Sequence, residues 1–309
     1  MKSNIPERLQ SFLDFANTLK MPETPKEARE RTEKVSEAFA IPKLKLPFTT
    51  ERSFSVENMS IPIRIYHPKP EDELPVILYL HGGGHVTGSL ESYDALCRKL
   101  ADACQCVLMS IGYRLAPEFP YPAGIYDCIN AVIKRTSILN GIQADLSQFF
   151  LIGDSAGGNL ALTATYLLEQ QERQAIRGLG LIYPSVDFTM QSNSIQHKGK
   201  KYLLTEERIR WFFDHYFAHG GDRLKASPLF FEHLERFPQL YIALAEHDPL
   251  VDEGLAFAKK ANDAGVKVQL EEFSGMVHGF AQLYAIVPQQ VLQLIKSIET
   301  FIASCLKHP

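Results

Sequence analysis

The sequence predicts an α/β fold in which a mostly parallel central sheet carries helices on both faces. From about residue 60 onward, short strand-like segments alternate with segments of helical spacing, the arrangement that gives a parallel sheet. Several strand-like segments are continuous apolar runs, which is typical of strands buried on both faces. No internal repeat, low-complexity tract or Gly/Ser linker interrupts this alternation, so residues 1–309 predict a single domain.

Each predicted element follows from its local pattern. Residues 60–66 alternate apolar and polar side chains, as a half-exposed edge strand does. The remaining strands are predicted at residues 75–80, 106–111, 149–152, 178–183, 240–245 and 266–273. Helical spacing predicts helices at residues 93–103, 124–136, 156–170, 254–264 and 289–306.

Two segments do not follow the alternation. Residues 1–45 are charged and helix-prone, and residues 187–230 contain an aromatic helix inserted between two strands. These segments either pack onto the domain or form a cap over an apolar pocket. We favour a helical cap, because both segments would lie near the carboxyl ends of the strands. The candidate pocket residues in and below it are Trp211, His215 and Tyr183.

The composition is that of a globular protein, with 45% apolar and 22% charged residues. A net charge of −4 and a pI near 6.2 give no electrostatic signal for nucleic acid or an anionic membrane. Lys198, Lys200 and Lys201 are the densest basic group, and we interpret them as a solvated loop. No apolar run approaches a membrane span, and the N-terminus lacks the apolar stretch of a signal peptide, so the predicted location is the cytoplasm.

No metal or cofactor is predicted. The five cysteines are odd in number and match neither a zinc site nor a disulfide framework, so we expect free thiols. His81 and His85 are four residues apart, a metal-ligand spacing only on a helix, and the glycines between them disfavour a helix. His81 is instead expected to order its loop through its ring nitrogens. Neither nucleotide-binding glycine pattern is present.

Two glycine-framed motifs carry the chemistry. His81-Gly82-Gly83-Gly84 and Gly153-Asp154-Ser155-Ala156-Gly157 each follow a predicted buried strand directly. Ligands of parallel sheets bind beyond the carboxyl ends of the strands, so both motifs should lie at the site. The second motif is a G-x-S-x-G, which places a serine on a strained turn between strand and helix. The first supplies amides without side chains that can converge on an oxyanion.

A serine nucleophile needs a base and an acid that orients the base. Sheets with this motif supply them in the chain order Ser, Asp/Glu, His. Asp248 stands just past the predicted strand 240–245, and His278 follows the predicted strand 266–273. Asp252 and Glu246 are weaker alternatives for the acid, since Asp252 lies a turn further along, in the first turn of the next helix.

At these residues the chain resembles the hormone-sensitive-lipase-like esterases, the HGGG group of the α/β-hydrolases. The resemblance covers residues 60–300 in the correct order and includes Tyr113-Arg114-Leu115-Ala116-Pro117-Glu118, Gly153 to Leu160, Asp248-Pro249-Leu250 with Asp252, and His278-Gly279-Phe280.

The resemblance implies an α/β-hydrolase fold with an N-terminal cap and a triad of Ser155, Asp248 and His278. It also implies an oxyanion hole built from the N–H groups of Gly83, Gly84 and Ala156. A homodimer through the final helix is common among such relatives. One position departs from the family, because His85 stands where an aromatic residue commonly follows HGGG; if it borders the acyl pocket, the site would be smaller and more polar.

The function expected is that of a serine carboxylesterase of the acetyl esterase type, acting on short-to-medium acyl esters through an acyl-enzyme. Hydrolysis of amides or formamides by the same triad is the runner-up, and a lipase is disfavoured because nothing marks a large mobile lid. A small-molecule receptor on this fold, as in the plant gibberellin receptors, lacks the catalytic histidine, whereas His278 is present here.

Overall fold

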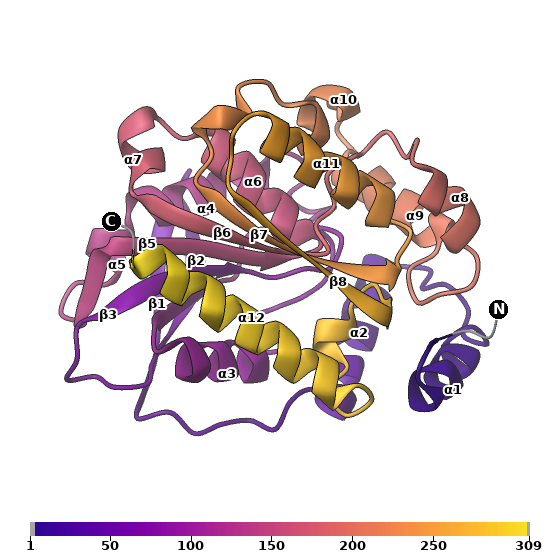
Figure 1. The fold of residues 1–309 in the computed structure, drawn as a ribbon, viewed down its shortest axis with the longest axis horizontal. Helices are drawn as coiled ribbons and strands as arrows, with labels where there is room; N and C mark the ends of the chain where they lie inside the picture. The colour runs from indigo at the N-terminus through magenta and orange to yellow at the C-terminus, as the bar shows by residue number, and fades with distance from the viewer. Residues whose placement is uncertain (1–3, 308–309) are drawn as a thin grey trace.

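The computed structural model describes residues 4–307 as one eight-stranded sheet with helices on both faces (Figure 1). The strand order is β1-β2-β4-β3-β5-β6-β7-β8. The first two pairings, β1 with β2 and β2 with β4, are antiparallel, and the pairings from β4 to β8 are parallel. The strands are β1 Phe48–Val56, β2 Met59–His67, β3 Leu74–Leu80, β4 Val107–Ile111, β5 Ala144–Asp154, β6 Ile176–Ile182, β7 Gln239–His247 and β8 Val268–Val277. The predicted fold class is confirmed.

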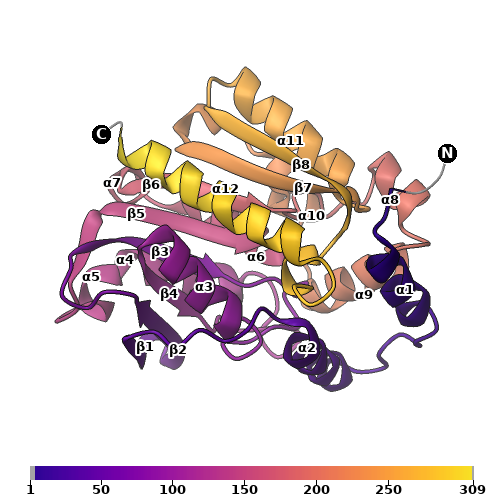
Figure 2. The same ribbon diagram turned by 60° about the horizontal axis from the view of Figure 1, so that its bottom comes forward.

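Alternate residues of one strand enter different apolar cores, which explains the continuous apolar runs. In β3, Val76 and Leu78 face one core while Ile77 and Tyr79 face the other. The first core includes side chains from α4 (Ala123–Ile133), α6 (Ala156–Leu167) and α11 (Val251–Asp263). The second includes side chains from α3 (Asp94–Cys104) and α12 (Pro288–Leu306), which lie side by side in Figure 2. A polar face on either side of these strands would therefore be buried without partners.

One strand prediction was wrong. Residues 60–66 form part of β2, but β2 is not an edge strand, because β1 pairs along its outer side from Phe48 to Val56. The alternation of β2 arises because Ile61, Ile63 and Ile65 face the core while the intervening side chains are covered less completely. The sequence analysis assigned no element to residues 48–56, whose polar residues hide the strand.

Two groups of helices gather where the parallel strands end, on the right of Figure 1. The first group is α1 (Glu7–Ala16) and α2 (Pro25–Phe39), from the N-terminal segment. The second is α8 (Asn193–Lys198), α9 (Glu206–Tyr216) and α10 (Arg223–Ala226), from the insertion between β6 and β7. Both segments that break the sequence pattern thus lie at the end of the sheet where ligands bind in such folds.

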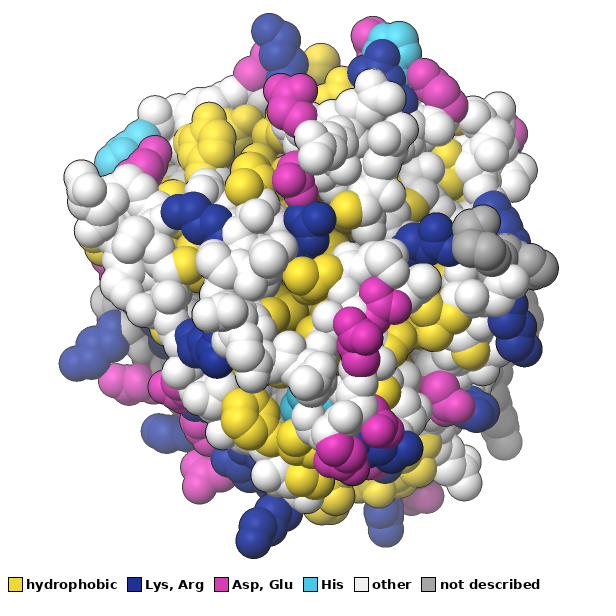
Figure 3. Space-filling model, turned by 90° about the vertical axis from the view of Figure 1, so that its left-hand side faces the viewer, with side chains coloured by type: hydrophobic (Ala, Val, Ile, Leu, Met, Phe, Trp, Pro, Cys, Tyr) yellow, Lys and Arg dark blue, Asp and Glu magenta, His cyan; other side chains and the backbone are white. Residues whose placement is uncertain are grey.

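The opposite end of the sheet has a mixed surface of charged and apolar side chains. In Figure 3, which faces the side away from α1 and α9, basic and acidic side chains are interspersed with small apolar areas. The short helices α5 (Arg135–Ile138) and α7 (Gln170–Gln174) belong to that end of the molecule (Figure 1). No helix within residues 4–307 is long and apolar enough to cross a membrane.

Candidate active site

Ser155 stands on a sharp turn between β5 and α6, with φ 54° and ψ −118°. A non-glycine residue rarely adopts a positive φ, and such strain needs support from its surroundings. The Ser155 N–H donates to Ile182 O at 2.8 Å, and Ser185 N–H donates to Ser155 O at 3.2 Å. The loop after β6 therefore holds the serine turn from both sides.

The glycines around this serine are required by close packing. A Cβ at Gly157 would lie 1.9 Å from Leu80 O, and a Cβ at Gly153 would lie 2.4 Å from the carbonyl of Gly157. Real side chains cannot occupy those distances. The G-x-S-x-G pattern thus lets α6 start directly against β3 and brings the serine next to the HGGG loop.

The structure brings Ser155, His278 and Asp248 together in a hydrogen-bonded row. His278 Nε2 lies 2.8 Å from Ser155 Oγ, and His278 Nδ1 lies 2.7 Å from Asp248 Oδ2. Asp248 is buried, and its Oδ1 accepts from Leu250 N–H at 2.8 Å. With the proton on Nδ1, the ring presents Nε2 as an acceptor to the serine hydroxyl, which is the arrangement a general base needs.

The rival acids have other partners. Glu246 accepts from Asn4 Nδ2, Ser274 Oγ and Gly275 N–H, and these bonds lower its pKa to about 2, the Asn4 bond most strongly. Asp252 lies in the first turn of α11 and accepts from Ser194 N–H at 2.8 Å. Neither carboxylate bonds to His278, so Asp248 is the acid that the geometry favours.

Three residues beside Ser155 have backbone N–H groups without acceptors among the described residues. Gly83, Gly84 and Ala156 line the same cavity as Ser155, and their N–H groups make no hydrogen bond within residues 4–307. Gly83 and Gly84 adopt φ 115° and 61°, which side chains disfavour. Donors of this kind, fixed before the reaction, are suited to a developing oxyanion.

Asp154 is a site residue that the sequence analysis did not single out. Its buried carboxylate accepts from Tyr79 and Tyr93 hydroxyls and from Gly82 N–H, each at 2.9 Å. Burial is the largest influence on Asp154 and raises the pKa of this carboxyl, against the opposing effect of the three donors. The position of Asp154 immediately before Ser155 could have drawn attention to it. Its hydrogen-bond partners lie far away in the sequence, so the motif alone does not show its role.

His81 lies beneath the glycine loop. Its Nδ1 lies 2.8 Å from Gly82 O, and its ring stacks on Tyr113 at 4.3 Å between centroids. Burial lowers the pKa of His81 to about 4. These contacts agree with the expectation that His81 orders the loop through its ring.

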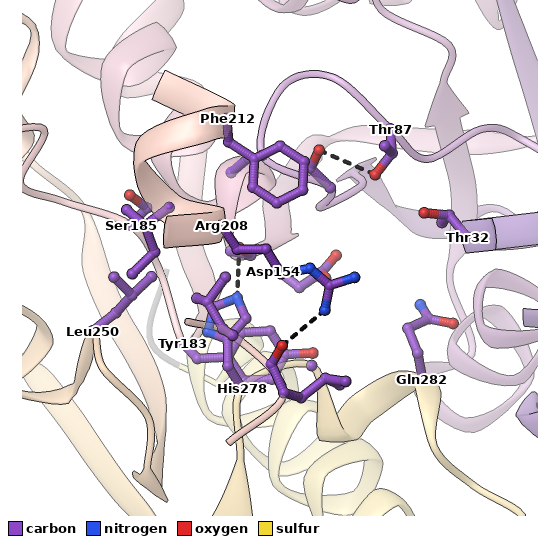
Figure 4. A pocket seen from close by; sticks show the side chains of 18 of the residues that line it. Thr32, Thr87, Asp154, Tyr183, Ser185, Arg208, Phe212, Leu250, His278 and Gln282 are labelled. Atoms are coloured by element: carbon purple, nitrogen blue, oxygen red, sulfur yellow. Dashed lines mark hydrogen bonds between the residues drawn. The ribbon is translucent and has the colours of Figure 1, made fainter. Parts of the chain in front are cut away.

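The cavity that contains Ser155 has a volume of about 210 Å³ and lies under the second group of helices. Its wall includes the predicted residues His85 and Tyr183 (Figure 4 labels Tyr183). Trp211 and His215 are not part of this wall, and their prediction is corrected. Their rings pack against each other with centroids 4.2 Å apart, while Ile209, Phe212 and Phe213 of the same helix line the cavity. Helical spacing alone does not separate the two sets, because Trp211 is three residues from Arg208 and His215 is three residues from Phe212.

His85 lies in the wall as a buried aromatic ring. It stacks on Tyr216 with centroids 3.8 Å apart and planes 7° apart, and neither ring nitrogen has a hydrogen-bond partner within residues 4–307. Burial lowers the pKa of His85 to about 3. The ring thus replaces the aromatic side chain common at this position without adding a charge. Within residues 4–307, no cluster of His, Cys, Asp and Glu could hold a metal ion.

The sequence and the fold both match known proteins. Residues 77–282 match the profile of a family described by its α/β-hydrolase fold. The chain is 34% identical to an ethyl acetate hydrolase of Pseudomonas putida, over 79% of this chain and 78% of the relative. It is 33% identical to an arylesterase of Saccharolobus solfataricus, over 82% of this chain and 84% of that protein.

The chain belongs to the α/β-hydrolase family. Among solved structures, an ester hydrolase from the metagenome of Lake Arreo aligns with a TM-score of 0.90 at 28% identity, covering 98% of this chain and 99% of the other. A hyperthermophilic esterase from the archaeon Pyrobaculum calidifontis aligns with a TM-score of 0.89 at 29% identity, covering 97% and 98%. The predicted resemblance to the HGGG-type esterases is confirmed, and this family member is a carboxylic ester hydrolase.

Proposed function

We propose that this α/β-hydrolase cleaves carboxylic esters of short-to-medium acyl chains through a Ser155–His278–Asp248 triad and an acyl-enzyme intermediate. The observation that carries the proposal is the continuous hydrogen-bonded row from Ser155 Oγ through His278 to Asp248, in one cavity with three unused backbone donors. A nucleophile, a base and an oxyanion site together account for both features.

In the proposed reaction His278 Nε2 takes the hydroxyl proton of Ser155 while the oxygen attacks the ester carbonyl. The carbonyl oxygen becomes an oxyanion held by the N–H groups of Gly83, Gly84 and Ala156. His278 then gives its proton to the leaving alkoxide, and the alcohol departs from the acyl-enzyme. Water, deprotonated by His278, cleaves the acyl-enzyme and releases the acid. Asp248 stabilises the imidazolium that forms in each half.

The acyl preference is inferred from the cavity. A volume of about 210 Å³ holds a short or medium acyl chain together with a small alcohol, and Phe212, Phe213 and Ile209 bound it on the α9 side. The helices of segments 1–45 and 187–230 are proposed as the cap that closes it. The cytoplasmic location and the homodimer remain predictions; exposed Leu270 of β8 and Leu292 of α12 offer an apolar edge for a second copy.

The test is hydrolysis of 4-nitrophenyl esters from acetate to palmitate by the wild-type chain and by Ser155→Ala. We expect a rate that depends on Ser155 and falls steeply beyond medium chains. Full activity in Ser155→Ala would exclude the triad, and undiminished activity on palmitate would favour a lipase. Matched 4-nitroanilides measure the competing amide hydrolysis, which we expect to be far slower.

A further inference from the structure

A second, larger cavity adjoins the one that contains Ser155. It has a volume of about 970 Å³ and lies between α1, α2 and α9. The two cavities share Val35, Leu203 and Arg208 in their walls. Arg208 of α9 therefore lies where the outer cavity meets the inner one, and Figure 4 shows its guanidinium group reaching into the open space between His278 and the wall formed by Thr32 and Gln282.

The charge of Arg208 has no counter-ion among the described residues. Its guanidinium donates to Leu203 O at 2.8 Å, and no carboxylate of residues 4–307 forms an ion pair with it. Burial lowers the pKa of Arg208, and the like charge of Arg31 adds to this effect. Arg29 of α2 shows the contrast, since it binds Glu118 in an ion pair. A cation withdrawn from water without a partner is costly, and a bound anion would remove that cost.

The side chain of Gln282 adds a donor without a partner to the same space. Gln282 Nε2 is buried and has no hydrogen-bond partner within residues 4–307, and the Gln282 side chain lines the inner cavity. Figure 4 places Gln282 on the wall towards which the Arg208 guanidinium points. Gln282 Nε2 and the Arg208 nitrogens that do not bond to Leu203 O can form a site for the oxygens of an anion, and a planar guanidinium matches a carboxylate in particular.

The outer cavity carries the opposite charge to the chain as a whole. The chain has a net charge of −4, yet six basic and two acidic residues line this cavity. The basic ones are Lys20, Arg31, Lys34, Lys200, Lys201 and Arg208, and the acidic ones are Asp14 and Glu207. Lys200 and Lys201, which sequence analysis interpreted as a solvated loop, are part of this surface. A positively charged outer cavity raises the local concentration of negatively charged ligands near the site.

We propose that the natural substrate is an ester that carries a carboxylate, and that Arg208 and Gln282 bind this carboxylate while Ser155 attacks the ester carbonyl. Monoesters of dicarboxylic acids and esters of carboxyl-bearing alcohols are the two substrate types of this class. The inference rests on the proposed function, because it assigns the substrate of the same site.

The first experiment uses two matched pairs of substrates. Mono(4-nitrophenyl) adipate and 4-nitrophenyl hexanoate differ by a carboxylate in place of a methyl group at the acyl end. The 4-acetoxybenzoate ion and its methyl ester differ by the charge on the alcohol side. For each pair, the ratio of kcat/KM for the charged ester to that for the neutral ester is measured in wild type, Arg208→Gln and Arg208→Lys.

We expect Arg208→Gln to lower this ratio by about tenfold or more in one of the pairs, the scale of a lost hydrogen-bonded charge partner, and Arg208→Lys to restore part of it. The pair that responds tells whether the carboxylate lies on the acyl or the alcohol side. Gln282→Leu should lower the same ratio by a smaller factor. Arg210→Gln is the matched control, because Arg210 lies on the same helix, is 57% exposed and pairs with Glu206. Its ratio should equal that of wild type.

Ratios that are the same in wild type and Arg208→Gln for both pairs would overturn the proposal. Because each ratio includes a neutral ester, a variant that is partly unfolded loses both rates and leaves the ratio unchanged. Failure of the proposed function looks different: neither neutral ester would be hydrolysed in a Ser155-dependent manner by the wild-type chain.

Discussion

The N–H group of Gly82 donates to the buried carboxylate of Asp154 at 2.9 Å, which joins the HGGG loop to the turn that carries the serine. The two segments follow different strands, β3 and β5, and this bond fixes the distance between them. Tyr79 and Tyr93 hold the same carboxylate from the second apolar core. The position of the proposed oxyanion donors relative to Ser155 therefore depends on a residue outside the proposed triad.

Asp154→Asn should reduce both stability and turnover. Asparagine replaces one acceptor oxygen with a donor, so that one of the three donors now facing the carboxylate loses its partner. We expect the free energy of unfolding to fall by about 1–3 kcal/mol, the cost of a buried unsatisfied group. Urea unfolding and kcat on 4-nitrophenyl butyrate measure the two effects. A variant with wild-type kcat would show that this bond does not position the oxyanion donors.

Gly157→Ala should fail to form the serine turn. The added Cβ would lie 1.9 Å from Leu80 O, a backbone atom that cannot move aside without shifting β3. We expect destabilisation of more than about 3 kcal/mol or no folded protein at all. Gly141→Ala is the control: its Cβ would meet nothing within 4 Å, so only its φ of 76° is unfavourable. Equal thermal shifts in the two variants would contradict the packing argument.

The mostly parallel sheet and the chain order of the proposed catalytic groups could be predicted because each depends on local patterns. Continuous apolar runs predict buried strands, and the glycines around Ser155 predict the turn there. Polar side chains hide β1 between Phe48 and Val56, since an edge strand needs apolar residues on only part of one face. Its pairing with β2 is a tertiary relationship, and so are the three partners of Asp154. A single sequence does not show these contacts.

His85→Phe should make the fold more stable and less sensitive to acid. The His85 ring is buried without hydrogen bonds and stacks on Tyr216, a contact that phenylalanine can keep. Removing two unsatisfied nitrogens should raise the free energy of unfolding by about 1–2 kcal/mol at pH 7.

The acid effect follows from the pKa of His85, which burial lowers from 6.5 to about 3. The unfolded chain takes up this proton below about pH 6.5 while the folded chain does not. The stability contributed by the neutral ring is therefore complete above pH 6.5 and is lost as the pH falls towards 3. Between pH 7 and pH 5 wild type should lose about 2 kcal/mol more than His85→Phe. Urea unfolding at both pH values measures the difference. An equal loss of unfolding free energy in wild type and His85→Phe would contradict the lowered pKa of His85.

Arg29→Ala should loosen the proposed N-terminal cap. Arg29 of α2 donates to Val86 O and Ala116 O, each at 2.9 Å, and pairs with Glu118. The same helix supplies Thr32 and Val35 to the cavity wall. We expect faster chymotrypsin cleavage within the N-terminal segment and a KM several-fold higher for 4-nitrophenyl butyrate, about 1 kcal/mol of lost binding. Lys26→Ala, an exposed basic residue of α2, is the control. Unchanged cleavage in Arg29→Ala would show that Arg29 does not hold the N-terminal segment in place.

The segment at residues 187–230 shows the limit of prediction from helical periodicity, which does not include the surface that a helix packs against. The aromatic content of residues 187–230 predicted an element that covers something, and its helices lie at the carboxyl ends of the strands. The pattern did not tell which aromatic residues of α9 reach the cavity, because Trp211, Phe212, Phe213, His215 and Tyr216 follow one another closely. Phe212 and Phe213 line the cavity, whereas Trp211 packs against His215 outside it. Only contact with the loops of the sheet decides which of these side chains line the cavity.

The central claim, that Ser155 is the nucleophile, is tested most directly by covalent labelling with diethyl 4-nitrophenyl phosphate. The serine oxygen should displace 4-nitrophenolate and retain the diethylphosphoryl group. Intact-mass and peptide mass spectrometry should then find one such group per chain, on Ser155, in step with the loss of esterase activity, and none on Ser155→Ala. Inactivation with the label on another residue, or full activity in a chain without Ser155, would contradict the account.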